Sequence, residues 1–304
     1  MPLTVSSRSA VRVRVPAKIN LHLGVGPLRE DNFHDVATVF HAVSLVDELT
    51  LEAGPPGITL VLEQPDDRVP ADSTNLAVRA VRKLADHVNL EPAVTIRLRK
   101  GIPVAGGMAG GSADAAAALI AGDALWNLAL PPETIHRLAA ELGSDVPFAL
   151  YGGDALGTGR GEQLTPLTHP YRRHWVLAVA GEGLSTPAVY AETDRLGGTR
   201  ASDPDPVIKA LGDPNPDALA GALCNDLQDA ALSLRPELHD VLEAGKTAGA
   251  LHGIVSGSGP TCAFLAPDPE RAEHIANRLR IAGLPGVSAV RVAHGSVEGA
   301  TLWP

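Results

Sequence analysis

Hydrophobic and polar residues alternate strictly over residues 11–15, Val-Arg-Val-Arg-Val, which is the pattern of a β-strand with one buried face. Residues 36–51 are rich in β-branched side chains and predict a second strand region. Shorter apolar runs predict two further strands, at residues 58–62 and 94–98. We therefore expect the chain to open with an antiparallel sheet.

Helical periodicity is interleaved with these strands, which places the chain in the α+β class. One predicted helix carries apolar residues at the spacing of a single face: Leu76, Ala80, Leu84 and Val88. The alanine-rich residues 112–128 predict a second helix, and residues 131–142 a third, which Gly143 is well placed to end.

The composition shifts around residues 164–173, and the next clear strand, residues 175–180, begins what we expect to be a second domain. Residues 202–217, rich in proline and aspartate, predict an exposed connector. Later runs predict helix, strand, strand, helix and strand, starting near Leu238, Gly253, Thr261, Pro269 and Ser288. This order is compatible with a split βαβ, or ferredoxin-like, layer. The predicted domains are residues 1–165 and 166–304.

Charge and cysteine content exclude several classes of partner. The 304 residues include 35 acidic and 25 basic side chains, a net charge of −10 that repels nucleic acids. Cys224 and Cys262 have neither the spacing of a disulfide framework nor that of a zinc site. The sequence shows no signal peptide and no apolar run long enough to span a membrane. We expect a cytoplasmic protein, a monomer or weak homodimer, that binds no nucleic acid and no membrane.

The strongest chemical signal is a glycine-rich segment between an expected strand and an expected helix. Its residues are Pro103, Val104, Ala105, Gly106, Gly107, Met108, Ala109, Gly110, Gly111 and Ser112. Four glycines allow backbone N–H groups to point inward beside a helix N-terminus, a geometry that binds phosphate. The segment is not a Walker A loop, because Ser112 stands where the lysine would be, nor a GxGxxG fingerprint, because its glycines fall in pairs. The alternative is a flexible loop before a helix.

Three shorter segments add candidate side chains. Lys18 and Asn20 share a face if the first strand continues, whereas the alternative for Lys18 is a solvated strand end. Asp145 follows a helix in Gly-Ser-Asp-Val-Pro and is either a reactive loop residue or an ordinary turn residue. Residues 256–260, Ser-Gly-Ser-Gly-Pro, join two expected strands and predict either a wall of a ligand site or a plain hairpin.

In this order, these segments resemble the GHMP superfamily of small-molecule kinases, which includes galactokinase and the homoserine, mevalonate and phosphomevalonate kinases. Five stretches resemble, within it, the family of kinases that phosphorylate 4-diphosphocytidyl-2-C-methyl-D-erythritol: residues 16–23, 29–34, 44–47, 143–148 and 185–190. The resemblance covers nearly the whole chain. It departs where the family usually has Gly-Tyr and this chain has Asn32-Phe33, although phenylalanine keeps an aromatic stacking face.

The resemblance implies a two-domain GHMP kinase fold, with an N-terminal layer like domain 2 of ribosomal protein S5 and a C-terminal ferredoxin-like layer. It also implies a reaction, the transfer of the γ-phosphate of ATP to the 2-hydroxyl of that cytidine diphosphate derivative. The product serves the non-mevalonate pathway of isoprenoid precursor synthesis.

Site residues follow from the same resemblance. Asp145 matches the general base, and Lys18 matches the cation that lowers the pKa of the substrate hydroxyl. The positions that match substrate contacts are Asn20, Phe33, His34, Thr186 and Tyr190, and those near the adenine are Asn75 and Lys100. Mg²⁺ is expected to arrive on the nucleotide, and no residue is assigned as a metal ligand.

Two other functions compete with this expectation. One is a different kinase of the superfamily, in which Phe33 and His34 serve another substrate. The other is a catalytically silent ligand sensor that kept the fold and the glycine loop. The presence of both Lys18 and Asp145 favours an enzyme over a sensor.

Overall fold

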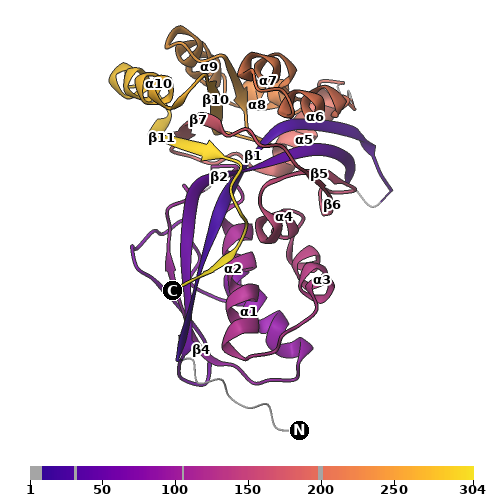
Figure 1. The fold of residues 1–304 in the computed structure, drawn as a ribbon, viewed down its shortest axis with the longest axis vertical. Helices are drawn as coiled ribbons and strands as arrows, with labels where there is room; N and C mark the ends of the chain where they lie inside the picture. The colour runs from indigo at the N-terminus through magenta and orange to yellow at the C-terminus, as the bar shows by residue number, and fades with distance from the viewer. Residues whose placement is uncertain (1–8, 31–32, 105, 198–200) are drawn as a thin grey trace.

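The computed structural model describes residues 9–30, 33–104, 106–197 and 201–304. Two parts follow one another along the long axis of the molecule (Figure 1). One part holds the chain's N-terminal half with helices α1 to α4, and the other holds β7, β10 and β11 with helices α5 to α10. The predicted domain boundary at residues 165 and 166 stays a prediction.

Two long antiparallel strands, β1 (Ala10–Leu28) and β2 (His34–Ala53), run through both parts. The predicted strands at residues 11–15 and 36–51 are confirmed, but β1 continues well beyond Val15. Pairing with β2 carries the strand past Pro16, and shifts of register between Pro16/Ala17 and Asn20/His22 absorb the irregularity. Lys18 and Asn20 therefore lie in one continuous strand.

The remaining elements of the first part extend this sheet or cover it. The strands are β3 (Gly57–Leu62), β4 (Ala93–Arg99), β5 (Asp154–Thr158) and β6 (Gln163–Leu167). The helices are α1 (Leu76–His87), α2 (Gly110–Leu125), α3 (Pro132–Leu142) and α4 (Val146–Tyr151). β4 pairs with β2, β3 lies parallel to β4, and β5 joins β2 to β6. Gly143 caps α3 as predicted, whereas α2 begins at Gly110, two residues before the predicted start.

Helix α2 is the centre of the main core. All its alanines except Ala124 are buried almost completely, and such small side chains allow the helix to approach the sheet and its neighbours closely. A Cβ atom on Gly122 would lie 2.6 Å from Cδ2 of Leu84, so α1 and α2 pack in close contact. The same two helices also meet at the N-terminal end of α2, where a Cβ atom on Gly111 would lie 3.4 Å from Cδ1 of Leu76.

The second part has the predicted ferredoxin-like layer. Its strands are β7 (Arg173–Ala180), β9 (His252–Val255), β10 (Cys262–Ala266) and β11 (Val287–Gly295). They form an antiparallel sheet in the order β11-β7-β10-β9. Helix α9 (Leu238–Thr247) precedes β9, and α10 (Pro269–Ala282) connects β10 to β11. The order of elements is therefore β-α-β-β-α-β, as the sequence predicted.

The prediction of an exposed connector at residues 202–217 is wrong. Helix α6 (Asp205–Leu211) lies inside this segment, with Val207 and Leu211 buried in the main core. Another helix, α7 (Pro216–Ala222), begins at its end. Pro206 and Pro216 lie in first helical turns, where the missing N–H costs nothing, so they mark helix starts and not an irregular chain.

The last elements connect the two parts. They are α5 (Thr186–Arg195), β8 (Cys224–Asn225), α8 (Gln228–Leu234) and β12 (Thr301–Trp303). β8 and β12 both pair with β1, so the C-terminal end of the chain returns to the first part. In the part of the chain that the structure describes, no helix combines the length and the apolar composition needed to cross a membrane.

Candidate active site

Lys18 and Asp145 meet at the wall of a cavity of about 660 Å³. Nζ of Lys18 lies 3.5 Å from Oδ2 of Asp145. The lysine is buried, with 8% of its surface exposed, and also donates to Oδ1 of Asn20 at 2.8 Å. The two residues are 127 positions apart in the sequence but form one ion pair, so an ammonium and a carboxylate face the same space.

The strand irregularities described above position Lys18 and Asn20. Both residues lie between the first two of the three register shifts in the β1–β2 pairing, and bulges commonly redirect side chains toward a site. The amide of Asn20 is held from its other end, because Nδ2 donates to Oγ1 of Thr38 at 2.7 Å. Thr38 in turn donates to the carbonyl of His22. This chain of hydrogen bonds fixes the amide oxygen that receives the Lys18 ammonium.

Asp145 is positioned by the helix that it precedes. It is the residue before α4, and its carbonyl accepts the N–H of Ala149. Phe148, in the first turn of α4, stacks on Phe40 of β2 with ring centroids 4.8 Å apart. Because Phe40 pairs with Asn20 across the sheet, this stack places Asp145 opposite Lys18.

The glycine-rich loop supplies another wall of the same cavity, through Gly107, Ala109 and Ser112. Ala109 has a left-handed φ of 58°, which is uncommon outside glycine and typical of a functional loop. It precedes α2, whose first N–H groups have no carbonyl partner within the helix. Free N–H groups and the positive end of a helix beside Lys18 make an anion site.

The other predicted loop residues have different surroundings. The Met108 side chain is buried in the core, while its carbonyl accepts the N–H of Lys18 at 3.3 Å. Gly106, Gly110 and Gly111 do not line the cavity, and Ala105 lies outside the described residues. Pro103 and Val104 line a separate hollow of about 240 Å³ together with Lys100.

Contact between the two glycine segments joins the parts of the molecule at the site. A Cβ atom on Gly107 would lie 2.5 Å from the carbonyl oxygen of Gly259, so only glycine fits there. The segment of residues 256–260 is the predicted hairpin between β9 and β10, and its Gly257 and Ser258 also line the cavity. It is therefore both a hairpin and a wall of the cavity.

Aromatic side chains gather in one region of the cavity, its aromatic end. His34 and Tyr190 stack with ring centroids 5.1 Å apart, and Phe33, half exposed, lines the same cavity. Nδ1 of His34 lies 2.8 Å from the carbonyl of Gly26 and must donate to it. The other ring nitrogen, Nε2, is buried without a hydrogen-bond partner among the described residues and lies 3.5 Å from Oδ2 of Asp194.

Helix α5 brings Tyr190 and Thr186 to the cavity from one face. Thr186, Tyr190 and Asp194 recur every four residues, and all three line the cavity. Oγ1 of Thr186 lies 2.9 Å from Oγ of Ser258. Burial, and secondarily the charge of Asp145, raises the pKa of Tyr190 to about 12, so its phenol stays neutral.

Lys100 and Asn75 lie apart from this cavity, and both have internal partners. The Lys100 ammonium is bonded to the carboxylates of Asp47 and Asp114, in a buried cluster. Burial alone would lower the pKa of Lys100, but the two carboxylates outweigh it and raise the pKa. Asn75 caps α1 by accepting from the N–H of Ala77 and donates to the carbonyl of Pro70. The predicted adenine contacts of these two residues stay predictions.

Sequence reasoning missed Asp194 and Arg160, which also line the cavity. Asp194 could have been found from its helical spacing to Thr186 and Tyr190. Arg160 stands between two glycines with left-handed φ, Gly159 and Gly161, which is a sequence signal for a tight turn.

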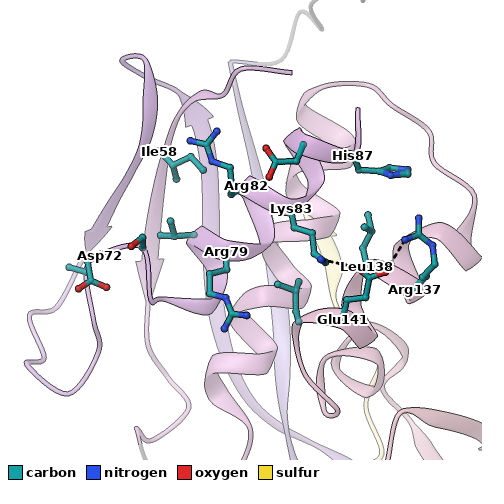
Figure 2. Close-up of a pocket in the computed structure, with 14 residues that line it drawn as sticks. Ile58, Asp72, Arg79, Arg82, Lys83, His87, Arg137, Leu138 and Glu141 are labelled. Atoms are coloured by element: carbon teal, nitrogen blue, oxygen red, sulfur yellow. Dashed lines mark hydrogen bonds and ion pairs between the residues drawn. The ribbon is translucent and has the colours of Figure 1, made fainter. Parts of the chain in front are cut away.

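A second hollow of nearly equal size, about 640 Å³, lies between α1 and α3 (Figure 2). Figure 2 shows Lys83 and Arg137 both directed at Glu141, with which they form ion pairs of 2.7 and 2.9 Å. None of the predicted site residues lines it. Lys18, Asp145 and the aromatic residues line the other cavity, so the similar volume of this hollow does not make it the active site.

Comparison with known proteins agrees with this location. The family model described as GHMP kinases N terminal domain matches residues 75–153, and that described as GHMP kinases C terminal matches residues 207–283. Both matches confirm the predicted superfamily and fold class.

Relatives over nearly the full length give a finer assignment. The 4-diphosphocytidyl-2-C-methyl-D-erythritol kinase of Salinispora tropica is 54% identical over 96% of this chain and 94% of the relative. That of Mycolicibacterium smegmatis is 52% identical over 97% and 93%. A crystal structure of 4-(cytidine 5'-diphospho)-2C-methyl-D-erythritol kinase has a TM-score of 0.77 at 32% identity, covering 93% of this chain and 98% of the other. The chain belongs to the GHMP kinases and, within them, to the 4-diphosphocytidyl-2-C-methyl-D-erythritol kinase family.

Proposed function

We propose that this protein transfers the γ-phosphate of ATP to the 2-hydroxyl of 4-diphosphocytidyl-2-C-methyl-D-erythritol, giving the 2-phosphate and ADP. The observation that carries the proposal is a single cavity with three kinds of wall: the glycine loop, the Lys18–Asp145 pair and the aromatic end. A substrate with an alcohol at one end and a pyrimidine at the other fits this arrangement.

Asp145 would act as the general base. Its carboxylate takes the proton of the 2-hydroxyl as that oxygen attacks the γ-phosphorus and the bond to the β-phosphate oxygen of ATP breaks. Lys18, 3.5 Å away, would stabilise the charge that develops on the attacking oxygen. Asn20 holds the ammonium in place through its 2.8 Å hydrogen bond.

The aromatic end would recognise cytosine. Tyr190 and Phe33 offer ring faces for stacking, and the buried Nε2 of His34, which has no hydrogen-bond partner among the described residues, is a polar atom available to the edge of the base. Leaving this buried nitrogen unpaired is costly, so the bound base should form a hydrogen bond with it.

ATP carries Mg²⁺ into such a site, where the ion neutralises phosphate charge. Mg²⁺ keeps several waters and takes few protein ligands when phosphates are present. The carboxylates that line the cavity are Asp145 and Asp194 alone, which suits an ion held mainly by the nucleotide. Cytoplasmic location and a monomer or weak homodimer remain part of the proposal, and the free thiols of Cys224 and Cys262 fit a reducing compartment.

ADP release measures the proposed activity directly. Purified protein with ATP and Mg²⁺ should release ADP with 4-diphosphocytidyl-2-C-methyl-D-erythritol, and cytidine should compete with that substrate. Homoserine and mevalonate, substrates of other kinases in the superfamily, should release none. Release with either of these would favour the alternative kinase, and binding of both ligands without ADP release would favour the silent sensor.

A further inference from the structure

Among the residues that the structure describes, Arg160 is one of two basic residues, with Lys18, that line the active-site cavity. Arg160 lies at the tip of the turn between β5 and β6. Its guanidinium carbon lies 5.4 Å from the ring centroid of Phe33, next to the aromatic end of the cavity. The side chain is 38% exposed, so a ligand can reach it.

The turn that carries Arg160 is held rigidly. Val36 of β2 donates its N–H to the carbonyl of Gly159 at 2.9 Å, which joins the turn to the strand of His34. The N–H of Arg160 itself donates to Oε2 of Glu162 at 2.8 Å. The backbone is thereby fixed while the long side chain extends over the cavity.

No carboxylate of the described residues forms a hydrogen bond with the guanidinium of Arg160. The acidic group closest to it among the ion pairs of the described residues is Glu162, with Nε and Oε2 3.9 Å apart. This separation exceeds a hydrogen bond, and the same carboxylate oxygen already accepts from the backbone. The N–H donors of the guanidinium, which suit the geometry of phosphate, therefore remain available.

The charges that line the cavity explain why a substrate with a diphosphate needs an arginine there. The lysine and arginine residues lining it are Lys18 and Arg160, and Lys18 is already bonded to Asn20 beside Asp145. A cytidine diphosphate derivative brings two phosphate groups, each with a negative charge, between its pyrimidine and its alcohol. Asp194 and Asp145 would repel these groups unless a second cation offset their charge.

We infer that Arg160 is the residue that binds the diphosphate of the nucleoside diphosphate substrate, an inference that rests on the proposed function. The side chain lies beside Phe33, so the same arginine also covers the aromatic ring against which the base stacks. Recognition of the substrate then combines a base, read by His34, with a diphosphate, read by Arg160.

Binding of cytidine and of cytidine diphosphate to the wild type and to Arg160→Gln separates this inference from a purely structural role. Calorimetry should show that the wild type binds cytidine diphosphate more tightly than cytidine. Arg160→Gln should weaken cytidine diphosphate about 10- to 100-fold while changing cytidine by less than about 3-fold. Arg160→Lys should restore part of the loss, because it supplies a point charge without the planar fork.

Arg82→Gln, in the second hollow, is the matched control and should change neither affinity. Equal losses for both ligands in Arg160→Gln would mean that Arg160 acts only by stacking on Phe33, and an unchanged affinity for cytidine diphosphate would also overturn the inference. If the wild type bound the diphosphate no better than cytidine, the inference would fail while the proposed function stood. If the wild type bound neither ligand, the proposed function would fail as well.

Discussion

Asp145 and Lys18 show how two ordinary side chains acquire a chemical role from their surroundings. Each has a common alternative in the sequence, a turn aspartate or a strand-end lysine. In the structure the aspartate has no side-chain capping bond to α4, although it precedes that helix, and instead faces the lysine. The lysine is buried against Phe40, 5.2 Å from its ring centroid. These contacts favour a role in the reaction for both residues over that of a turn aspartate and a solvated strand-end lysine.

Asp145→Asn removes the proposed base while keeping the shape of the side chain. We expect kcat to fall about 10²- to 10⁴-fold, because a neutral amide cannot accept the hydroxyl proton. ATP affinity should change less than about 3-fold, since the phosphates bind at the glycine loop. Stopped assays of turnover, with nucleotide binding measured separately, test both parts, and Asp86→Asn on the exposed side of α1 is the control. A sharp loss of ATP affinity would contradict the assignment.

Tyr190 should contribute its ring and not its hydroxyl. The phenol has a pKa of about 12, so it is protonated throughout the pH range of an assay. It has no hydrogen-bond partner among the described residues. Tyr190→Phe should therefore keep KM for the cytidine substrate within about 3-fold, with the same pH profile between about pH 6 and pH 10. Tyr190→Ala should raise KM roughly 10- to 100-fold through lost stacking. Similar KM values for the alanine and phenylalanine variants would show that the ring is not used.

Sequence motifs indicated which residues belong to the site, but not which partners those residues contact. The pattern Pro-Ala-Lys-Ile-Asn and the glycine loop singled out Lys18, Asn20 and Ser112, and all three line the cavity, while their predicted roles stay predictions. Arg160 and Asp194 escaped, because single charged residues on a turn and a helix resemble solvated ones until the fold brings them together. The partners of Lys100 lie 53 and 14 positions away, and no local pattern announces such a cluster.

Two elements, β1 and α6, differ from what the local preferences of their residues predict. Alternation predicted β1 only as far as Val15, because Pro16 and the glycines beyond it normally weaken strands. Tertiary pairing with β2 carries the strand through them, and the resulting irregularities are where the site lies. Prolines had the opposite effect at α6, where they were read as breakers although they begin the helix. In both cases, position within the element decided the effect of a residue.

Gly107 tests how closely two elements must approach at the phosphate site. Gly107 and Gly283 both have positive φ, at 71° and 57°, so alanine costs roughly 1 kcal/mol at either position. A Cβ on Gly107 would also meet the carbonyl of Gly259 at 2.5 Å, whereas nothing lies within 4 Å of one on Gly283. Gly107→Ala should therefore lower the denaturation free energy by about 1–3 kcal/mol more than Gly283→Ala.

Gly107→Ala should also weaken ATP binding more than 10-fold, because displacing the loop moves its N–H groups. Denaturant titration and nucleotide binding on both variants measure these effects. Equal behaviour of the two variants would show that the glycine segments need not touch.

Across the whole molecule, a buried network joins the two parts behind the site. Trp175 of β7 donates to Nε2 of His41 on β2 at 3.0 Å, so Nδ1 of that ring carries the proton that it donates to Asp154. His169 donates to the other oxygen of Asp154 at 2.8 Å. Burial alone would raise the pKa of Asp154, but the two histidines outweigh it and lower the pKa. None of this network was predicted, because its members come from four separate segments.

Asp154 should make stability depend on pH. Its folded pKa is below the unfolded value of about 3.9, so its contribution is complete above that value and is lost as pH falls toward the folded pKa. Asp154→Asn should lower the denaturation free energy by about 3 kcal/mol at pH 7, since it places an N–H group against a histidine donor. The difference from wild type should shrink between pH 5 and pH 3. Denaturant midpoints at both values test this, and a constant difference would contradict the lowered pKa.

The sequence predicted the order of the elements along the chain more fully than the contacts between the two parts of the molecule. The ferredoxin-like order of β7 to β11 could be predicted because each element has its own periodicity and its own turn residues. The contacts that close the site, between Gly107 and Gly259 and between Lys18 and Asp145, depend on how the two parts pack together. Local patterns do not contain that information.

Phosphorus NMR of the reaction mixture tests whether one cavity brings ATP and the alcohol of a cytidine diphosphate substrate to the Lys18–Asp145 pair. With 4-diphosphocytidyl-2-C-methyl-D-erythritol, ATP and Mg²⁺, we expect one new phosphomonoester resonance from the 2-position, an equal amount of ADP, and an intact substrate diphosphate. Release of inorganic phosphate without the monoester, or bound ligands without any new resonance, would contradict it.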